Sequence, residues 1–374
     1  MTITAVLGIG LLLAYANGAN DNYKGVATLL GSGTASYRRA LLWATVTTAL
    51  GSLTALVFAR GMLAAFAGNG LVPAAVVADP AFPTAVALAA GLTVLLATRL
   101  GFPISTTHAL LGGLVGAGLV ASASGINTVT LATGFILPLL TSPLVSAALS
   151  GGIYPGLRAG RRALGITRET CVCVGDAIVG VVPGAPGHAA ALQAVTLPTV
   201  SVGDSPSCRV RYSGRVLGLD ARILLDIAHY ASAGAVSFAR GLNDTPKIAA
   251  LLLVGNLVAP SAALMAVGLV MATGGFISAR QVAATMSHGV TDMNAGQGFT
   301  ANAITSALVI GASTLGLPVS TTHVSCGALF GIGTVTRLAH RHTIRHIVLA
   351  WVVTLPMAAL LAAVALVTMR VFVG

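Results

Sequence analysis

The sequence GFPISTTH at residues 101–108 returns as GLPVSTTH at residues 316–323, and this repeated stretch decides the fold. A second pattern, GANDNYK at residues 18–24, returns in the same order as GLNDTPK at residues 241–247. Glycines follow both copies of the first pattern at matched positions, namely Gly112, Gly116 and Gly118 in the first half and Gly327, Gly331 and Gly333 in the second. The chain is therefore internally duplicated, and polar, Gly/Pro-broken segments at equivalent places of an apolar duplication are typical of transporter binding sites.

The composition indicates an integral membrane protein. Of 374 residues, 56% are hydrophobic and only 8% are charged, and the mean hydropathy is +0.92. These values exclude a soluble globular domain and a disordered chain. The net charge of +11 does not favour nucleic-acid binding, because the arginines cluster between apolar runs instead of forming a basic face beside aromatic residues. Such clusters are typical of cytoplasmic loops.

The apolar runs predict broken as well as complete membrane spans. A helix needs about 20 residues to cross the hydrocarbon core, and the runs after both Ser-Thr-Thr-His motifs are shorter than this. They predict re-entrant half-helices, which must be packed inside protein or line a wet cavity. With the arginine-rich loops on the cytoplasmic side, both termini are extracytoplasmic and each half crosses an odd number of times, which gives an inverted repeat.

The predicted fold is thus an all-α polytopic membrane protein, with inverted repeats, broken helices, re-entrant hairpins and a small β-rich cytoplasmic insert. We expect a first membrane repeat at residues 1–157, the insert at 158–221 and a second repeat at 222–374. In the insert, residues 171–174, 195–197 and 208–212 alternate with period two between Pro/Gly turns. Three cysteines there and His188 offer soft metal ligands, but their spacing favours reduced structural thiols, so no metal site is predicted.

Each Pro-x-Ser-Thr-Thr-His segment predicts the start of a helix. Proline is at home in a first helical turn and Ser or Thr is preferred as N-cap. The first amides of such a helix lack intrahelical acceptors and lie at the positive end of its dipole, which suits a small oxyanion. The predicted substrate-binding residues are the hydroxyl side chains of both copies, together with two lysines of the other motif: Ser105, Thr106, Thr107, Ser320, Thr321, Thr322, Lys24 and Lys247. The alternative is that these hydroxyls only cap buried helices.

The Asn-Asp pairs of the other motif predict cation binding. Carboxylates inside membrane segments are costly and usually mark ion pathways, so Asn20, Asp21, Asn243 and Asp244 offer hard oxygen ligands to Na⁺, or the aspartates carry a coupled proton. A purely structural ion pair is the alternative, because Lys24 and Lys247, the only lysines in the chain, each follow an aspartate by one helical turn. We expect the lysines either to neutralise the aspartates or to add positive potential at the substrate site.

Other polar residues receive smaller roles. His108 and His323 are expected to fix the hairpins by hydrogen bonds, although a histidine titrates in a range suited to proton transfer. The glycines that follow them predict close helix packing, not ligand chemistry. Four polar residues flank the second hairpin without an assigned role: Gln281, Asp292, Gln297 and Asn302.

At these duplicated motifs the chain resembles the PiT family of inorganic phosphate transporters. The resemblance covers both membrane halves and implies a cation-coupled symporter in the cell membrane, homodimeric, with the anion at the two Ser-Thr-Thr segments and cations at the two Asn-Asp pairs. Family members usually carry a small or amide residue where this chain has Lys24 and Lys247, and alanine where it has Leu242. These departures leave Na⁺ or H⁺ coupling open, and leave sulfate open as substrate.

Secondary-active transport of phosphate is therefore the leading hypothesis. Hydrogen phosphate can donate a hydrogen bond to a carboxylate, whereas sulfate only accepts hydrogen bonds. An aspartate that faces the anion therefore favours phosphate, and an aspartate neutralised by its lysine permits sulfate. The alternatives are a sulfate permease of the same fold, an uncoupled anion channel and a receptor. An enzyme is not predicted, because no metal triad, nucleophile elbow or phosphate-cradling glycine loop is present, and no catalytic residue or cofactor is assigned.

Overall fold

The computed structural model describes residues 3–58, 60–122, 125–167, 169–183, 192–204, 217–253 and 258–372. It divides into two compact units. Unit 1 comprises Met1–Tyr154 and His229–Gly374, and unit 2 comprises Pro155–Ala228. Each unit is described by itself.

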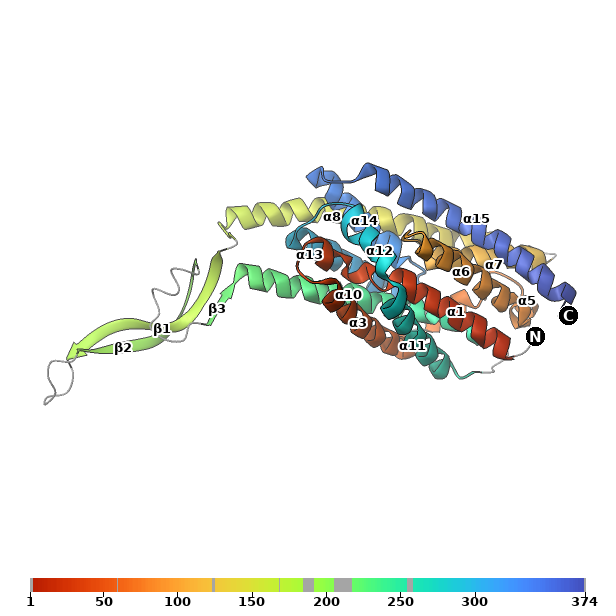
Figure 1. The fold of residues 1–374 in the computed structure, drawn as a ribbon, viewed down its shortest axis with the longest axis horizontal. Coiled ribbons are helices and arrows are strands. Elements are labelled where there is room, and N and C mark those ends of the chain that lie inside the picture. The colour runs from red at the N-terminus through yellow and green to blue at the C-terminus, as the bar shows by residue number, and fades with distance from the viewer. Residues whose placement is uncertain are drawn as a thin grey trace. The chain divides into compact units, whose positions relative to one another are not determined.

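The first half of the chain is helical (Figure 1). Its elements are α1 (Ile3–Asp21), the 3-10 turn η1 (Lys24–Val26), α2 (Ala27–Gly31), α3 (Tyr37–Phe58), α4 (Arg60–Phe66), α5 (Ala74–Ala78), α6 (Ala81–Arg99), α7 (Thr106–Ala121), the π-helical turn η2 (Thr130–Ile136) and α8 (Leu137–Ala163).

The second half is helical as well. Its elements are α10 (Ala221–Ala249), the 3-10 turn η3 (Ala250–Leu252), α11 (Pro260–Ser278), α12 (Arg280–Ala284), the π-helical turn η5 (Thr285–Gly289), α13 (Ala295–Thr314), α14 (Thr321–Thr336) and α15 (Arg341–Phe372).

Among the described residues, five helices are long and apolar enough to cross a membrane: Tyr37–Phe58, Ala81–Arg99, Thr130–Ala163, Pro260–Ser278 and Arg341–Phe372. Helices α7 and α14 have 16 residues each, less than the roughly 20 that a full crossing needs. The predicted helical membrane fold with short helices after both Ser-Thr-Thr-His motifs is confirmed. In unit 1, α15 runs along α6 and α7, and α1 packs between α6 and α11 (Figure 1).

The repeated stretch forms the same local structure twice. Gly101 lies just after the end of α6 and Gly316 just after the end of α13. Their φ angles of 73° and 70° are in the left-handed conformation that follows many helices. The next amides close each end, from Phe102 to Ala97 and from Leu317 to Ala312, both at 2.9 Å. A short extended segment with the proline follows, and the half-helix then begins.

Serine caps both half-helices, as the sequence predicts. Ser105 has φ −97° and ψ 112°, and its hydroxyl accepts a hydrogen bond from the His108 amide at 3.1 Å. Ser320 has φ −101° and ψ 114°, and its hydroxyl accepts from the His323 amide at 3.2 Å. Each hairpin is therefore fixed by a glycine turn on one side and a serine cap on the other.

The matched glycines are packing positions. Gly112 and Gly116 of α7 lie against the backbone of α15, and Gly327 and Gly331 of α14 lie against the backbone of α8. In all four, a Cβ atom would overlap a backbone carbonyl oxygen of the neighbouring helix. The half-helices thus depend on glycine for close approach, as the small-residue spacing predicts.

We expect Gly116→Ala to lower the free energy of unfolding by about 1 to 3 kcal/mol, because the added methyl group meets the Ala359 backbone and forces the helices apart. The matched control is Gly311→Ala on α13, where nothing lies within 4 Å of the new Cβ and the change removes glycine from a helix interior. Thermal unfolding in detergent compares the two variants. Equal stability of both would contradict the proposed close approach.

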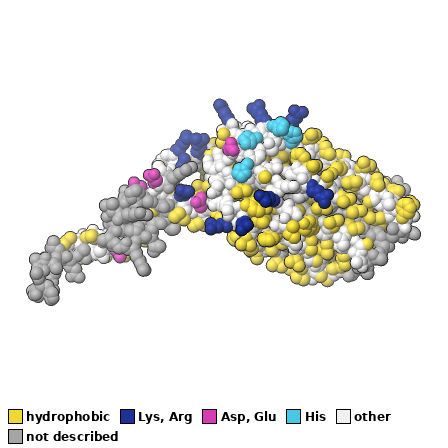
Figure 2. All heavy atoms as spheres, viewed as in Figure 1, with side chains coloured by type: hydrophobic (Ala, Val, Ile, Leu, Met, Phe, Trp, Pro, Cys, Tyr) yellow, Lys and Arg dark blue, Asp and Glu magenta, His cyan; other side chains and the backbone are white. Residues whose placement is uncertain are grey.

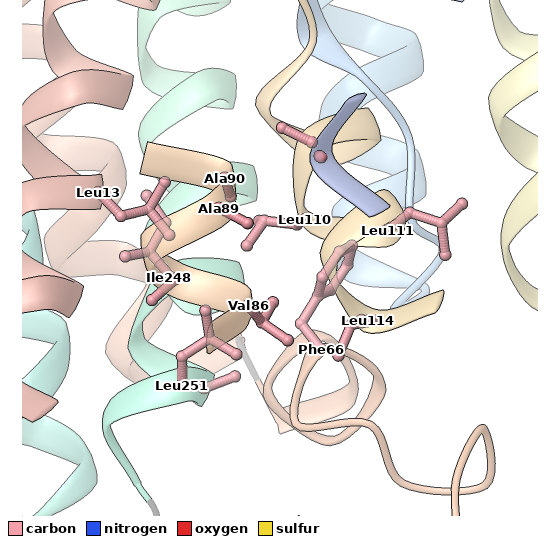
Figure 3. Close-up of a cluster of buried hydrophobic side chains, with 14 of the residues drawn as sticks. Leu13, Phe66, Val86, Ala89, Ala90, Leu110, Leu111, Leu114, Ile248 and Leu251 are labelled. Atoms are coloured by element: carbon pink, nitrogen blue, oxygen red, sulfur yellow. The ribbon is translucent and has the colours of Figure 1, made fainter. Parts of the chain in front are cut away.

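Apolar side chains from several helices fill the centre of unit 1 (Figure 3). They come from α1, α4, α6, α7, the end of α10 and η3, and include Leu13, Phe66, Val86, Leu110, Leu111, Leu114, Ile248 and Leu251. This core lies beside the half-helix α7 and holds it in the interior. It thereby fixes the position of the first hairpin.

The outer surface of unit 1 is also apolar, as expected of a protein whose helices face lipid (Figure 2). Exposed large hydrophobic side chains lie on α3, α8, α11 and α15, among them Leu53, Val57, Leu140, Leu144, Leu269, Val352 and Leu360. Both lysines are buried, so the blue side chains that gather with histidines at one edge of this face are arginines (Figure 2).

Unit 2 contains an antiparallel sheet of β1 (Thr170–Pro183), β2 (Leu192–Asp204) and β3 (Leu217–Asp220), in the order β2-β1-β3. The predicted strands at 171–174 and 195–197 are confirmed within β1 and β2. The segment at 208–212 and His188 lie outside the described residues. No metal-binding cluster occurs in the part that the structure describes. Cys173 is in a disulfide, so the expectation of reduced thiols is wrong for this residue.

Candidate functional site

The two hairpins meet in the interior of unit 1. We call residues 103–107 the first tip and residues 318–322 the second tip. The six predicted hydroxyl residues of the two tips are all buried. The Thr322 hydroxyl donates to the carbonyl oxygen of Ile104 at 3.0 Å, and the Thr107 hydroxyl donates to the carbonyl oxygen of Val319 at 3.4 Å. These reciprocal bonds join residues that lie far apart in the sequence.

Lys24 binds both tips. Its ammonium donates to the Asp21 carboxylate and to the side-chain oxygen of Asn20 at 2.7 Å. It also donates to the carbonyl oxygen of Ile104 at 2.7 Å and to the Thr322 hydroxyl at 2.8 Å. The ammonium is therefore surrounded by four oxygen atoms, which would equally suit a small metal cation.

Lys247 makes the matching contacts from the second half. Its ammonium donates to the Thr107 hydroxyl at 2.8 Å and to the Val319 carbonyl oxygen at 2.7 Å, and it lies 3.4 Å from the Asp244 carboxylate. Each lysine thus bonds to a threonine in the opposite half of the chain. The ammonium groups of the two lysines therefore each link the first tip to the second.

The two aspartates lie close to one amide group. Asp21 accepts hydrogen bonds from the Thr106 hydroxyl at 3.1 Å and from the Asn17 amide at 2.9 Å. The same nitrogen of Asn17 lies 3.0 Å from the Thr106 hydroxyl and 3.5 Å from the Asp244 carboxylate. The structure therefore brings Asp21, Asp244 and the first tip together around Asn17.

The two asparagines fix the hairpins. The Asn20 amide donates to the Thr98 hydroxyl at 2.9 Å and to the Phe102 carbonyl oxygen at 3.1 Å. The Asn243 amide donates to the Val319 carbonyl oxygen and to the Thr321 hydroxyl, both at 3.2 Å. Their amide nitrogens therefore hold the turns in place, and the Asn20 oxygen is bound by Lys24.

The hydroxyl groups of the tips differ in whether their hydrogen atoms are free to donate to a ligand. Thr106, Thr107 and Thr322 donate to protein oxygens, so an anion would have to displace these bonds. Ser320 and Thr321 only accept hydrogen bonds from the described residues. The second tip therefore presents the hydroxyl hydrogens that are ready to donate to an oxyanion.

The two motif histidines pack against each other where the half-helices begin. The rings of His108 and His323 lie 4.3 Å apart, and His323 lies 3.8 Å from the ring of Trp351 on α15. The ring of His108 is 3.2 Å from the Ser105 hydroxyl. The Trp351 indole donates to the Pro103 carbonyl oxygen at 3.2 Å, so α15 also holds the first tip.

Two buried residues of the site were missed by the sequence reasoning. Asn17 and Arg240 stand one helical turn before Asp21 and Asp244, at matched positions of the two motifs. Both side chains are buried, and Arg240 is only 1% exposed. The signal that would have found them is a polar residue at the same place in both copies, next to an otherwise apolar run.

The four residues without an assigned role lie elsewhere. When the side-chain amide of Gln281 is oriented to form hydrogen bonds, its nitrogen donates to the carbonyl oxygen of Thr98. Gln297 forms a capping box with Asn294. Asn302 donates to the Thr28 hydroxyl at 2.8 Å. Asp292 is 72% exposed and pairs with His340. None of these bonds involves the tips.

Comparison with known proteins agrees with the fold. Residues 17–362 match the phosphate transporter family. A putative phosphate permease of Pyrococcus horikoshii is 27% identical over 97% of this chain and 96% of its own length. The chloroplastic inorganic phosphate transporter 2-1 of Arabidopsis thaliana is 28% identical over 96% of this chain and 71% of its own length.

A solved structure described as the sodium-dependent phosphate transporter has the same fold. It superposes with a TM-score of 0.74 and 20% sequence identity, and the match covers 100% of both chains. The family comprises membrane transporters and not enzymes. This chain belongs to the phosphate transporter family.

Proposed function

We propose that this protein moves inorganic phosphate across the cell membrane by secondary-active, cation-coupled transport. The observation that carries the proposal is that the tips of both halves meet in the interior, bridged by Lys24 and Lys247. The helix N-termini there supply positive dipole ends, and the second tip supplies unused hydroxyl donors. In this proposal the six tip hydroxyl residues contact the substrate, and the Asn-Asp pairs belong to the cation site.

Alternating access follows from the same arrangement. If the two halves form an inverted repeat, the tips lie near the middle of the membrane and each half can open one side in turn. The cross-bonds from each lysine to the opposite tip would have to break and re-form during this cycle. In the proposed topology both termini are extracytoplasmic and the insert is cytoplasmic, which cysteine labelling from either side tests.

The contacts of the lysines support neutralisation of the aspartates over a direct role in substrate binding. Lys24 is held by a carboxylate and three further oxygens, which leaves its charge largely compensated. A tethered ammonium thereby does electrostatically what a bound Na⁺ would do. In this proposal the coupling ion, Na⁺ or H⁺, binds an aspartate when the neighbouring lysine moves away from it.

The direct experiment is uptake of labelled phosphate into proteoliposomes under an imposed Na⁺ gradient, an H⁺ gradient or neither. We expect concentrative uptake with one of the two gradients. Uptake of labelled sulfate in place of phosphate would favour the sulfate permease, and flux without any coupling would favour an anion channel. Light scattering of the purified protein in detergent tests the homodimer that the resemblance implies.

Removing the ammonium tests its role as a tethered cation. We expect Lys24→Met to become dependent on Na⁺, because the oxygen atoms around Lys24 remain and the Asp21 charge needs a counter-ion. The unfolding temperature of the variant should rise when choline chloride is replaced by NaCl, while the unsubstituted protein changes much less. Identical responses of both proteins to Na⁺ would contradict the idea.

A further inference from the structure

Arg240 carries hydrogen-bond donors that the described residues do not use. It lies on α10, is only 1% exposed and is among the largest fully buried side chains. One terminal nitrogen lies 3.3 Å from the Asn22 side-chain oxygen and 3.4 Å from the Thr48 hydroxyl. Its Nε and other terminal nitrogen have no partner among the described residues. A buried guanidinium with unused N–H groups is energetically costly, because these groups have lost their hydrogen bonds to water and have formed none to the protein.

The buried charges around Arg240 are not balanced. Asp21 pairs with Lys24 and Asp244 pairs with Lys247. Arg240 has no ion pair with any described carboxylate, and the acidic groups that act on its charge are Asp21 and Asp244. Together these three cations and two carboxylates leave one positive charge in excess. In a membrane protein, a buried cation without an ionic partner is a candidate functional residue.

Arg240 belongs to the same segment of the chain as the second Asn-Asp pair. Arg240 stands one helical turn before Asp244, as Asn17 stands one turn before Asp21, and Asn17 bonds to the Thr106 hydroxyl. Asn22, which holds one nitrogen of Arg240, directly follows Asp21. The Ser237 hydroxyl, one turn before Arg240, also lacks a partner among the described residues and lies against Gly25. A second unused donor therefore lies on the same face of α10.

We infer that Arg240 is the cationic ligand of the transported oxyanion, with its unused N–H groups donating to the anion's oxygen atoms. This inference rests on the proposed function and adds to it a residue outside both tips. Hydrogen bonds between a guanidinium and an oxyanion are charge-assisted and strong, so the anion compensates both the unused donors and the excess charge. The first half offers only the neutral Asn17 at the matched position, so the site is asymmetric in charge.

The experiment compares Arg240→Met, Arg240→Lys and the control Arg99→Met in proteoliposomes. Arg99 is an exposed arginine in the last turn of α6, so its replacement removes one positive charge from the surface and none from the interior. We expect Arg240→Met to raise the half-saturation concentration of labelled inorganic phosphate at least about tenfold. Arg240→Lys should recover part of this loss, and Arg99→Met should leave the half-saturation concentration unchanged.

Thermal unfolding in detergent, with and without inorganic phosphate, separates substrate binding from a structural role. Without phosphate, Arg240→Met should unfold at or above the temperature of the unsubstituted protein, because it removes an uncompensated buried charge. Added phosphate should stabilise the unsubstituted protein and Arg99→Met, but not Arg240→Met. A variant that is less stable without phosphate, yet still fully stabilised by it, would overturn the inference and assign Arg240 a structural role.

The two proposals fail in different ways. If the unsubstituted protein takes up phosphate and Arg240→Met has the same half-saturation concentration, only the role of Arg240 is refuted. If the unsubstituted protein neither takes up phosphate nor is stabilised by it, the proposed function fails and the inference falls with it.

Discussion

Asp21→Asn should lower the free energy of unfolding by about 3 to 5 kcal/mol, the range found when one partner of a buried ion pair is removed. The Asp21 side chain is only 4% exposed in the structure. Its substitution removes the carboxylate and leaves the Lys24 ammonium buried without an ionic partner. It also weakens the bonds that Asp21 accepts from Asn17 and Thr106. Titration of the detergent-solubilised protein with a denaturing detergent measures this loss.

A double-mutant cycle gives the control. Asp21→Asn combined with Lys24→Met removes both charges, so we expect the double variant to be more stable than either single variant. The matched pair Asp244 and Lys247 lies at 3.4 Å, a longer contact, and should show a smaller coupling energy. Additive losses at Asp21 and Lys24 would mean that the two residues do not stabilise each other.

Thr321→Val should raise the half-saturation concentration for phosphate uptake about tenfold or more. Valine keeps the shape of threonine and removes a hydroxyl that accepts from Asn243 but donates to no described residue. Because that hydroxyl hydrogen is free to donate to an anion, its loss should weaken binding more than folding. Initial rates of labelled phosphate uptake into proteoliposomes measure the change.

The matched control for Thr321 lies on the same helix. Thr334 is exposed on α14, and its hydroxyl donates only to the Phe330 carbonyl oxygen, so Thr334→Val should leave phosphate uptake unchanged. If Thr321→Val and Thr334→Val behaved alike, with normal half-saturation concentrations, the second tip would not contact the substrate through this hydroxyl.

Local features of the hairpins could be predicted from the sequence because they depend on nearby residues. Ser105 and Ser320 cap their helices through bonds to residues three positions away, and Gly101 and Gly316 end the preceding helices. The duplication supplied a second, independent copy of the same signals. The pairing of Lys24 with Asp21 was also foreseeable, since one helical turn brings their side chains together.

Contacts between the halves could not be predicted from the sequence. Lys24 reaches Thr322 and Lys247 reaches Thr107 only because the packing of all the helices brings the two tips together. Trp351 joins the first tip from the far end of the chain for the same reason. Arg240 directly precedes a repeated motif in the sequence. That its N–H groups lack partners depends on which side chains surround it in the folded protein, and the sequence does not give these neighbours.

The central claim is that the tips of both halves enclose one phosphate ion, and arsenate offers the most direct test. Arsenate has the shape and charge of phosphate, and arsenic gives an anomalous X-ray signal that locates it without ambiguity. Crystals grown with arsenate should show one strong peak per chain, contacted by residues 105–107 and by residues 320–322. A peak bound by one tip alone, or bound away from both, would contradict the account.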